Sequence, residues 1–449
     1  MKFNNLAYNS PGEMIFGSCP KPVSCKNGMI IGGGIVYPEV KFTLPIMELS
    51  LRNEDEIRFL YKQIVSEVLN RVSILKMEGV VLEFEHLPFM TENPEYGAAI
   101  TRTIREAMSV FSEQHSTPCL LRVTPVDIRS EKIRTGERTK ILFKSFERNC
   151  EAGADLVAIE SIGGKSVHDK AIVEGDIAGI LLSLGILGCK DMEFLWDKIV
   201  TVSNKYSCIP SGDSACGFAN TAMVLADRSY IPKVLATIVR AMSAARTLVA
   251  VESGARGPSK DCAYEGPIVK AISGTPISME GKSSACAHFS HLGNVAAALC
   301  DLWSNESVQQ VKLLAGYAPE CFSEILSYDC RLMNTAVRTG NAKLLQSLFV
   351  ESDIAHNPQA FIIAPEIAFK IAESIVSESS NFGRTFKAAI TACTLLRDGF
   401  QKNVFKLEKP EIIWLDKIEG ALDSLDTEEK VFTATQQYKN LYDSGEYGV

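Results

Sequence analysis

Along the middle of the chain, short runs of hydrophobic residues alternate with longer stretches in which hydrophobic and polar positions follow a helical spacing. The short runs have the length of buried strands. Their starts lie about 30 to 50 residues apart, which is the size of a strand followed by a helix. Seven runs predict strands: VVLEFEH (80–86), CLLRVTP (119–125), LVAIES (156–161), CIPSGD (208–213), TLVAVES (247–253), PISMEG (276–281) and VKLLAG (311–316).

Strands that alternate with helices favour a parallel sheet, and seven or eight such units favour a closed barrel over an open sheet. We therefore predict an α/β fold with a (β/α)8 TIM barrel over residues 76–335. The hydrophobic pattern does not place an eighth strand.

The two flanks of the predicted barrel differ from it. Residues 1–75 combine a glycine-rich extended piece, MIIGGGIVYPEVKFTLP, with a helical stretch, and we expect an N-terminal extension there. Residues 336–449 contain amphipathic helices such as RTFKAAITACTLLRDGF. We expect this C-terminal helical segment either to cover the flank of the barrel or to bind a partner.

The composition narrows the class of protein. At 449 residues and 46% hydrophobic, the chain can bury a large core. A net charge of −8 with dispersed lysines and arginines argues against binding to nucleic acid. The longest apolar stretch, IAGILLSLGILG, is shorter than the roughly 20 residues of a membrane helix, and the first residues lack the pattern of an export signal. We expect a cytoplasmic protein with no membrane segment, whose 13 cysteines are reduced.

Three residues with metal-ligand side chains follow the predicted strands. Glu160 ends the run at 156–161, Cys216 follows the run at 208–213, and Cys262 lies in SKDCAYE, after the run at 247–253. Separations of about 50 residues are too long for a local zinc knuckle but suit neighbouring barrel loops. Two thiolates and a carboxylate with an open fourth position would suit catalytic zinc, and thiolates argue against magnesium or calcium. Singly, each cysteine could be a buried thiol and Glu160 could pair with an arginine.

Three further acids lie at the same ends of the predicted strands. Glu83 and Glu85 lie in LEFEH, and Asp213 ends CIPSGD. Each could donate a proton in the pocket or form a salt bridge.

Two other patterns support weaker hypotheses. His288 and His291 in CAHFSH could share one helix face, with Cys286 beside them, but without a further ligand they are typical of polar packing or of residues at the pocket mouth. The run Gly32-Gly33-Gly34 matches neither a dinucleotide-binding motif nor a P-loop, so no nucleotide site is predicted.

Five segments together resemble a known family. ADLVAIESIGGK, SGDSACGFANTAMVLA, GPSKDCAYEGPIVKAI, PISMEGKSSACAH and CDLWSNESV resemble, in this order, the zinc-containing methanol:corrinoid methyltransferase subunits (MtaB) of methylotrophic methanogens and acetogens. The resemblance covers nearly the whole chain and implies a (β/α)8 barrel with additional helices. It also implies a zinc ion held by one glutamate and two cysteines, which fall on Glu160, Cys216 and Cys262.

The resemblance implies a reaction as well. A cobalt(I) corrinoid on a partner protein would take the methyl group of methanol, and zinc would act as a Lewis acid on the leaving oxygen. Glu83, Glu85 and Asp213 are the candidate proton donors. The family also implies a homo-oligomer. A methoxylated donor, a noncatalytic scaffold for a corrinoid protein, and a methanogenic or an acetogenic pathway remain open alternatives.

Overall fold

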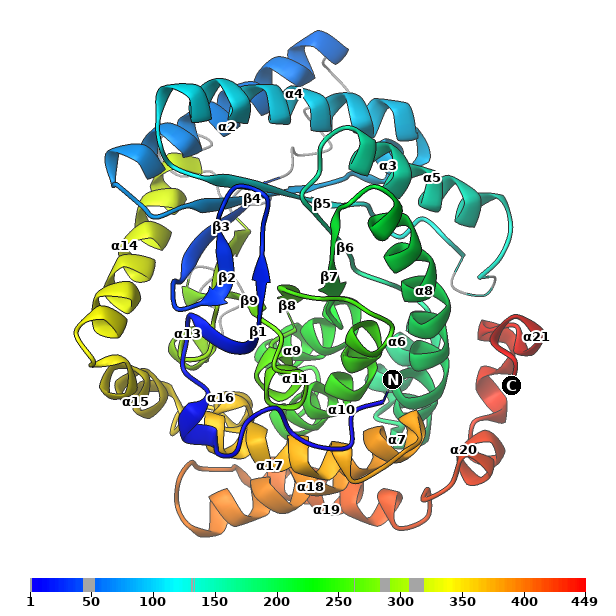
Figure 1. The fold of residues 1–449 in the computed structure, drawn as a ribbon. Helices are drawn as coiled ribbons and strands as arrows, with labels where there is room; N and C mark the ends of the chain where they lie inside the picture. The colour runs from blue at the N-terminus through cyan, green and yellow to red at the C-terminus, as the bar shows by residue number, and fades with distance from the viewer. Residues whose placement is uncertain are drawn as a thin grey trace.

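The computed structural model describes residues 2–42, 53–130, 132, 134–261, 263–282, 291–306 and 319–449. Within them, parallel strands form one closed barrel in the order of the chain, and helices surround it (Figure 1). The strands are β3 (Tyr37–Phe42), β4 (Val80–Glu85), β5 (Cys119–Thr124), β6 (Leu156–Ile159), β7 (Ile209–Asp213), β8 (Ser259–Asp261), β9 (Ile277–Glu280) and β10 (Leu302–Glu306).

Two features of the backbone show the closure. β10 pairs with β3 in parallel, so the last strand returns to the first. Between β7 and β8, the backbone N–H of Arg256 donates to the carbonyl of Pro210 over 2.7 Å, and that of Gly257 donates to Ser211 over 3.0 Å. These contacts confirm the predicted (β/α)8 barrel.

Five of the seven predicted strands are observed, as β4, β5, β6, β7 and β9. The strand predicted at 247–253 is wrong, because these residues lie almost entirely in the last turns of helix α10 (Lys233–Glu252). That helix is buried on nearly all sides, which removes the polar face that marks a surface helix. The strand predicted at 311–316 lies outside the described residues.

The hydrophobic pattern of the sequence does not predict strands β3, β8 and β10. β3 reads YPEVKF and β8 reads SKD, because their inward positions carry charged side chains such as Glu39, Lys41 and Lys260. The division of the chain into residues 1–75, 76–335 and 336–449 stays a prediction, but β3 shows that the barrel begins before residue 76.

An antiparallel hairpin closes the N-terminal end of the barrel. It consists of β1 (Ser18–Ser24) and β2 (Ile30–Gly33). The Nδ2 of Asn27, at its turn, donates to the carbonyl of Cys119 at the start of β5 over 2.6 Å. Its apolar residues pack with the first residues of the strands in a separate core: Val23, Met29, Ile31, Tyr37, Val81, Leu120, Leu156 and Ile209. The opposite end is therefore the open one.

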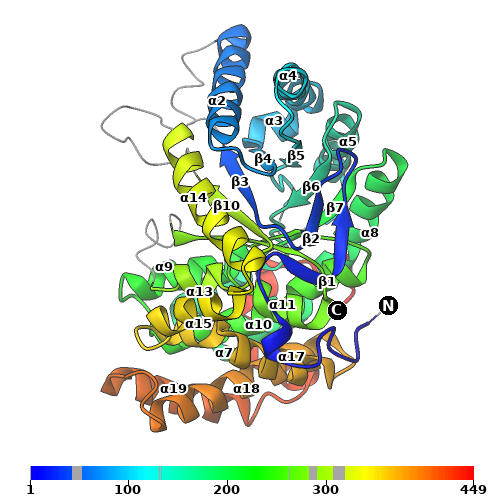
Figure 2. The same ribbon diagram turned by 60° about the vertical axis from the view of Figure 1, so that its left-hand side comes forward.

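Helices cover the outside of the sheet, with several shorter turns between them (Figures 1 and 2). The capping of α2 explains where that helix begins, since Asn53 accepts from the backbone of Glu56 while Glu56 accepts from the backbone of Asn53. The helices and turns of the barrel region are η1 (Pro11–Glu13), α2 (Glu54–Ile74), α3 (Pro88–Glu92), α4 (Pro94–Gln114), α5 (Glu137–Glu151), α6 (Lys165–Glu174), α7 (Ile177–Leu181), η2 (Leu182–Gly188), α8 (Cys189–Lys205), η3 (Cys216–Asn220), α9 (Thr221–Asp227), α10, α11 (Gly266–Ser273), α13 (Gly293–Ala297) and α14 (Pro319–Arg338).

Two of the C-terminal helices pack on one flank of the barrel, where α18 lies against α10 and α17 against α11 (Figure 2). Of the described helices, α10 alone is long and apolar enough to cross a membrane, and 94% of its most apolar window is buried inside the protein, as in a core helix. The C-terminal elements are α15 (Ala342–Asp353), α16 (Pro358–Ile363), α17 (Pro365–Val376), α18 (Asn381–Gln401), α19 (Lys409–Leu422), α20 (Glu428–Ala434), η4 (Gln436–Leu441) and α21 (Ser444–Tyr447).

Candidate active site

Five charged side chains meet at the C-terminal ends of the barrel strands. Lys260 Nζ contacts the carboxylate of Glu160 and lies 3.5 Å from Glu85 Oε1 and 3.7 Å from Glu83 Oε1. Lys41 Nζ lies 2.9 Å from Glu85 Oε2 and 3.9 Å from Glu160 Oε1. We call these five residues the rim cluster. In it, three carboxylates share two ammonium groups, so the cluster carries one net negative charge when all five are ionised.

The members of the rim cluster differ in their exposure. The side chain of Glu160 is 27% exposed and that of Glu85 is 14% exposed, whereas Glu83 and Lys260 are almost completely buried. Glu83 also accepts a hydrogen bond of 2.8 Å from Thr124 Oγ1. Glu160 is therefore the carboxylate of this group that is most accessible from the barrel mouth.

Burial and neighbouring charges have opposite effects on the pKa values of the rim cluster. Burial raises the pKa of Glu85, and the ammonium groups of Lys260 and Lys41 oppose that rise. Burial alone would lower the pKa of Lys260, but the carboxylates of Glu160 and Glu85 outweigh it and hold that pKa well above its usual value. Lys260 therefore stays charged across the neutral pH range.

A second ion pair lies one layer deeper in the barrel. Arg122 on β5 and Glu39 on β3 are both fully buried, and Arg122 Nε lies 2.7 Å from Glu39 Oε1. Arg122 also donates to the carbonyl of Pro258 over 3.0 Å, and Ser278 Oγ donates to Glu39 over 2.7 Å. These bonds satisfy the two charges inside the barrel, as a buried ion pair requires.

Sequence reasoning missed both lysines of the rim cluster and the deeper pair. The signal that could have found them is a charged residue inside an otherwise apolar run, as with Arg122 in CLLRVTP, or between two Gly-Pro pairs, as with Lys260 in GPSKDCAYEGP. Such a residue is costly to bury without a partner.

Asp213, a predicted proton donor, lies outside the rim cluster. It ends β7, is fully buried, and accepts hydrogen bonds of 2.6 Å from Ser161 Oγ and from the backbone of Ser214. Burial raises its pKa to about 6, against the opposing effect of Arg246, whose Nη2 lies 3.9 Å away. Asp213 therefore contacts the loop that follows Glu160, while Glu83 and Glu85 contact the lysines.

Two of the three predicted metal ligands follow consecutive strands of the barrel. Glu160 follows β6, and Cys216 is the first residue of η3, just after β7. Asn220 Nδ2 lies 3.6 Å from the half-buried Sγ of Cys216. Cys262, the third predicted ligand, lies outside the described residues.

The parts of the chain that the structure describes contain no group of three His, Cys, Asp or Glu side chains arranged to hold a metal ion. The grouping of Cys286 and His288 lies outside these parts. His291 is exposed, and its ring lies 6.1 Å from that of His356.

Comparison with known proteins decides the family. The model of the family described as methanol-cobalamin methyltransferase B subunit (MtaB) matches residues 1–447. The chain belongs to this family.

Two relatives agree with this membership. The methanol–corrinoid protein co-methyltransferase of Methanosarcina barkeri is 38% identical over 432 residues, which is 94% of this chain and 93% of that protein. The crystal structure of the methanol:cobalamin methyltransferase complex MtaBC from Methanosarcina barkeri contains a chain that superposes with a TM-score of 0.95 at 36% identity, covering 100% of this chain and 99% of that one. The chain is therefore a methyltransferase, and the family resemblance of its five segments is confirmed.

Proposed function

We propose that this protein transfers the methyl group of methanol to the cobalt(I) corrinoid of a partner protein, with a zinc ion held by Glu160, Cys216 and Cys262. The family and the relatives named above support methyl transfer between methanol and a corrinoid. The observation that supports the site is the position of Glu160 just after β6 and of Cys216 just after β7, two neighbouring strands of the barrel.

The residues present fit a bound zinc ion. A thiolate, a second thiolate and a carboxylate form a donor set that zinc accepts, with a fourth position left for the substrate. The Lys260 ammonium contacts the Glu160 carboxylate, so this carboxylate already has a positive partner at the barrel mouth. When bound, the metal supplies Lewis acidity, which lowers the charge that the departing oxygen of methanol must carry.

The protein itself must balance the charge around this site. Two thiolates and Glu160 carry three negative charges, and Glu83 and Glu85 would add two more. Lys41 and Lys260 offset two of these five charges, since their ammonium groups lie close to the carboxylates of Glu83, Glu85 and Glu160. The paired lysines therefore limit the repulsion that would otherwise oppose five negative groups at one rim.

The leaving oxygen also needs a proton. In the reaction, cobalt(I) supplies the electron pair for the new bond to the methyl carbon, the C–O bond breaks, and the oxygen leaves as hydroxide that must become water. Of the three candidate donors, Glu85 lies in the rim cluster with a partly exposed carboxyl group, whereas Glu83 and Asp213 are fully buried. Burial raises the pKa of Glu85 and so favours the protonated form that a donor needs, and we therefore assign proton donation to Glu85.

The test combines metal content with activity. The wild-type protein is expected to hold one zinc ion per chain and to form methylcobalamin from methanol and cob(I)alamin, measured by its absorbance. Cys262→Ala and Glu160→Gln are expected to lose zinc and activity together. Cys25→Ala is the control, because Cys25 is a half-buried cysteine in the connection of the hairpin at the opposite end of the barrel.

Each alternative has its own outcome. Stoichiometric zinc without methylcobalamin from methanol would refute methanol as the donor, and activity with a methoxylated compound would then identify the other donor class. Zinc without activity on either donor would favour a scaffold for a corrinoid protein. If Cys262→Ala keeps its zinc, the ligand set is wrong. A cytoplasmic location and a homo-oligomer stay predictions.

A further inference from the structure

The loop that follows Glu160 is held through its backbone by distant parts of the chain. The backbone N–H of Ser161 faces the Asp213 carboxylate at 3.4 Å, and the backbone N–H of Ile162 donates to Asp127 Oδ2 over 3.2 Å. Both acceptors follow or end barrel strands, so these two bonds tie the loop to the barrel itself.

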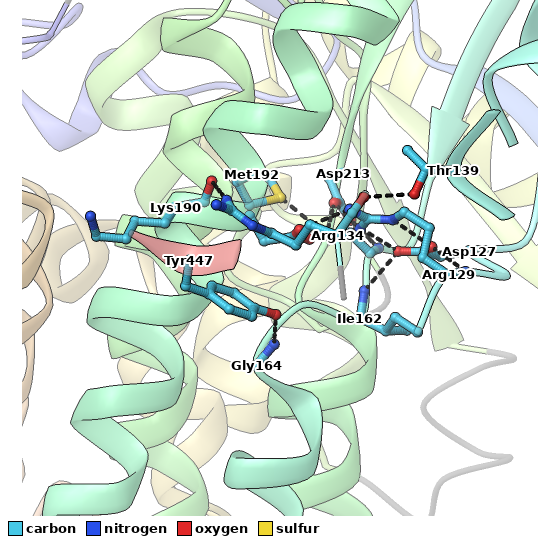
Figure 3. A network of polar contacts seen from close by, with 12 residues as sticks. Asp127, Arg129, Arg134, Thr139, Ile162, Gly164, Lys190, Met192, Asp213 and Tyr447 are labelled. Atoms are coloured by element: carbon cyan, nitrogen blue, oxygen red, sulfur yellow. Dashed lines mark hydrogen bonds and ion pairs between the residues drawn. The ribbon is translucent and has the colours of Figure 1, made fainter. Parts of the chain in front are cut away.

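The third bond comes from the other end of the chain. The backbone N–H of Gly164 donates to the hydroxyl oxygen of Tyr447 over 3.1 Å, and both residues are buried (Figure 3). Gly164 has a φ of +83° and directly precedes α6, which makes it the hinge between the loop and that helix. Tyr447 therefore fixes the point where the chain turns from Glu160 into α6.

The junction at Gly164 is connected to both of the described residues that we propose as metal ligands, Glu160 and Cys216. The ring of His168 on α6 meets the ring of Phe218 on η3 edge-on, with centroids 5.1 Å apart. η3 is the turn that begins with Cys216. A shift of Gly164 would therefore move α6 and disturb the turn that carries Cys216 as well as the loop that carries Glu160.

The loop has little room to adjust. A Cβ atom added at Gly163 would lie 2.2 Å from Cγ of Asp191. Asp191 in turn accepts hydrogen bonds of 2.8 and 2.7 Å from Arg129, which also donates to Asp127 over 2.9 and 2.7 Å. This buried network, drawn in Figure 3, forms a fixed wall beside the loop.

The turn that carries Tyr447 is itself firmly docked. Glu446 accepts hydrogen bonds from the backbone of Arg134 over 3.1 Å and from Thr135 Oγ1 over 2.6 Å. The Arg134 guanidinium lies over the Tyr447 ring, 4.7 Å from its centroid, and Lys190 Nζ donates to the carbonyl of Gly448 over 3.1 Å. The hydroxyl of Tyr447 is thus held in place by contacts that do not involve the loop.

We propose that Tyr447 is a positioning residue for the metal site, acting through Gly164 on the loop that carries Glu160. This inference rests on the proposed function, because it assumes that Glu160 binds zinc. Residues that orient metal ligands through hydrogen bonds typically change metal affinity by about 10- to 100-fold when they are lost.

The test is Tyr447→Phe, which removes the hydroxyl and keeps the ring. We expect its zinc affinity, measured by competition with a chromophoric chelator, to fall by about 10-fold. We also expect the Gly164 amide to exchange its hydrogen faster in hydrogen–deuterium exchange, measured on the metal-free protein.

The matched control is Tyr438→Phe. Tyr438 is also buried in the C-terminal segment and also loses a hydrogen bond, but its hydroxyl donates to Glu174 and Asp176 over 2.8 Å, at the far end of α6. We expect Tyr438→Phe to keep the wild-type zinc affinity. A purely structural role would change the stability of both variants and the zinc affinity of neither.

Two results would overturn the inference alone: Tyr447→Phe with wild-type zinc affinity, or equal losses of affinity in Tyr447→Phe and Tyr438→Phe. In both cases the loss of zinc in Cys262→Ala would leave the proposed metal site intact. A wild-type protein that binds no zinc would refute the metal site itself and this inference with it.

Discussion

His168 should make the protein sensitive to acid. Its side chain is fully buried on α6 against Phe218, and neither ring nitrogen has a hydrogen-bond partner among the described residues. Burial, together with the positive charges of Lys165 and Arg246, lowers the pKa of His168 to about 3. The imidazole is therefore neutral in the folded protein at every pH near neutrality.

The sign and size of the effect follow from this pKa. The folded-state pKa lies below the unfolded value of about 6.5, so His168 contributes stability above pH 6.5 that is lost as the pH falls toward about 3. At pH 5 the unfolded chain binds the proton and the folded chain does not. The resulting loss in the free energy of unfolding is about 2 kcal/mol.

The assay compares the free energy of unfolding in urea at pH 7 and pH 5 for wild type and His168→Leu. We expect the drop between the two pH values to be smaller in the variant by about 2 kcal/mol. The change in the free energy of unfolding between the two pH values is compared between wild type and variant, because other buried groups also contribute to it. Burial raises the pKa values of Asp213 and Asp301 to about 6, so these residues oppose the effect of His168 in both proteins.

The control is His356→Leu, because the side chain of His356 is exposed and meets water in both states. It should leave the pH dependence unchanged. If His168→Leu showed the full wild-type drop between pH 7 and pH 5, the reasoning about a buried neutral imidazole would be refuted.

Two further predictions concern the barrel interior and the loop after Glu160. Arg122→Met leaves the Glu39 carboxylate buried without its guanidinium and should lower the free energy of unfolding by about 3 to 5 kcal/mol, while adding Glu39→Gln should recover part of that loss; urea unfolding checks both. Gly163→Ala forces a Cβ against Asp191 and should cost about 1 to 3 kcal/mol, whereas Gly420→Ala, with open space around its Cα, should not destabilise. Equal stability of the two glycine variants would contradict the close approach at Gly163.

The strands made mostly of apolar residues could be predicted from the sequence, even where one position carries a buried charged side chain, as Glu83 does in β4 and Arg122 in β5. β4, β5, β6, β7 and β9 are buried on both faces, so their sequences form compact apolar runs between helices. The strand predicted at 247–253 fails for the complementary reason. A helix buried on all sides has no polar face, and its apolar residues then resemble a strand.

The remaining strands depend on partners that lie elsewhere in the chain. Glu39 and Lys41 in β3 make that strand look like a surface segment, and only the pairing of Glu39 with Arg122 and of Lys41 with Glu85 makes their burial favourable. No local pattern contains this information, because the partners come from β4 and β5.

Part of the candidate site could likewise be predicted from the sequence, and part depends on the tertiary structure. The motifs around Glu160 and Cys216 place these residues after strands by local pattern and by family resemblance. The contact of Lys260 with Glu160 joins residues of β8 and of the loop after β6, and it requires the closed barrel. The contact of Tyr447 with Gly164 joins the last helical turn to the same loop.

By itself, the sequence determined the class of fold, the family and the residue types that can hold a metal, because hydrophobic period and short motifs are local properties of the chain. The tertiary structure decided which charged side chains share the rim of the barrel and which distant groups hold the loop after Glu160. Those contacts depend on distances of a few ångströms between residues far apart in the chain. Such distances are set only when the barrel closes and the C-terminal helices pack against it.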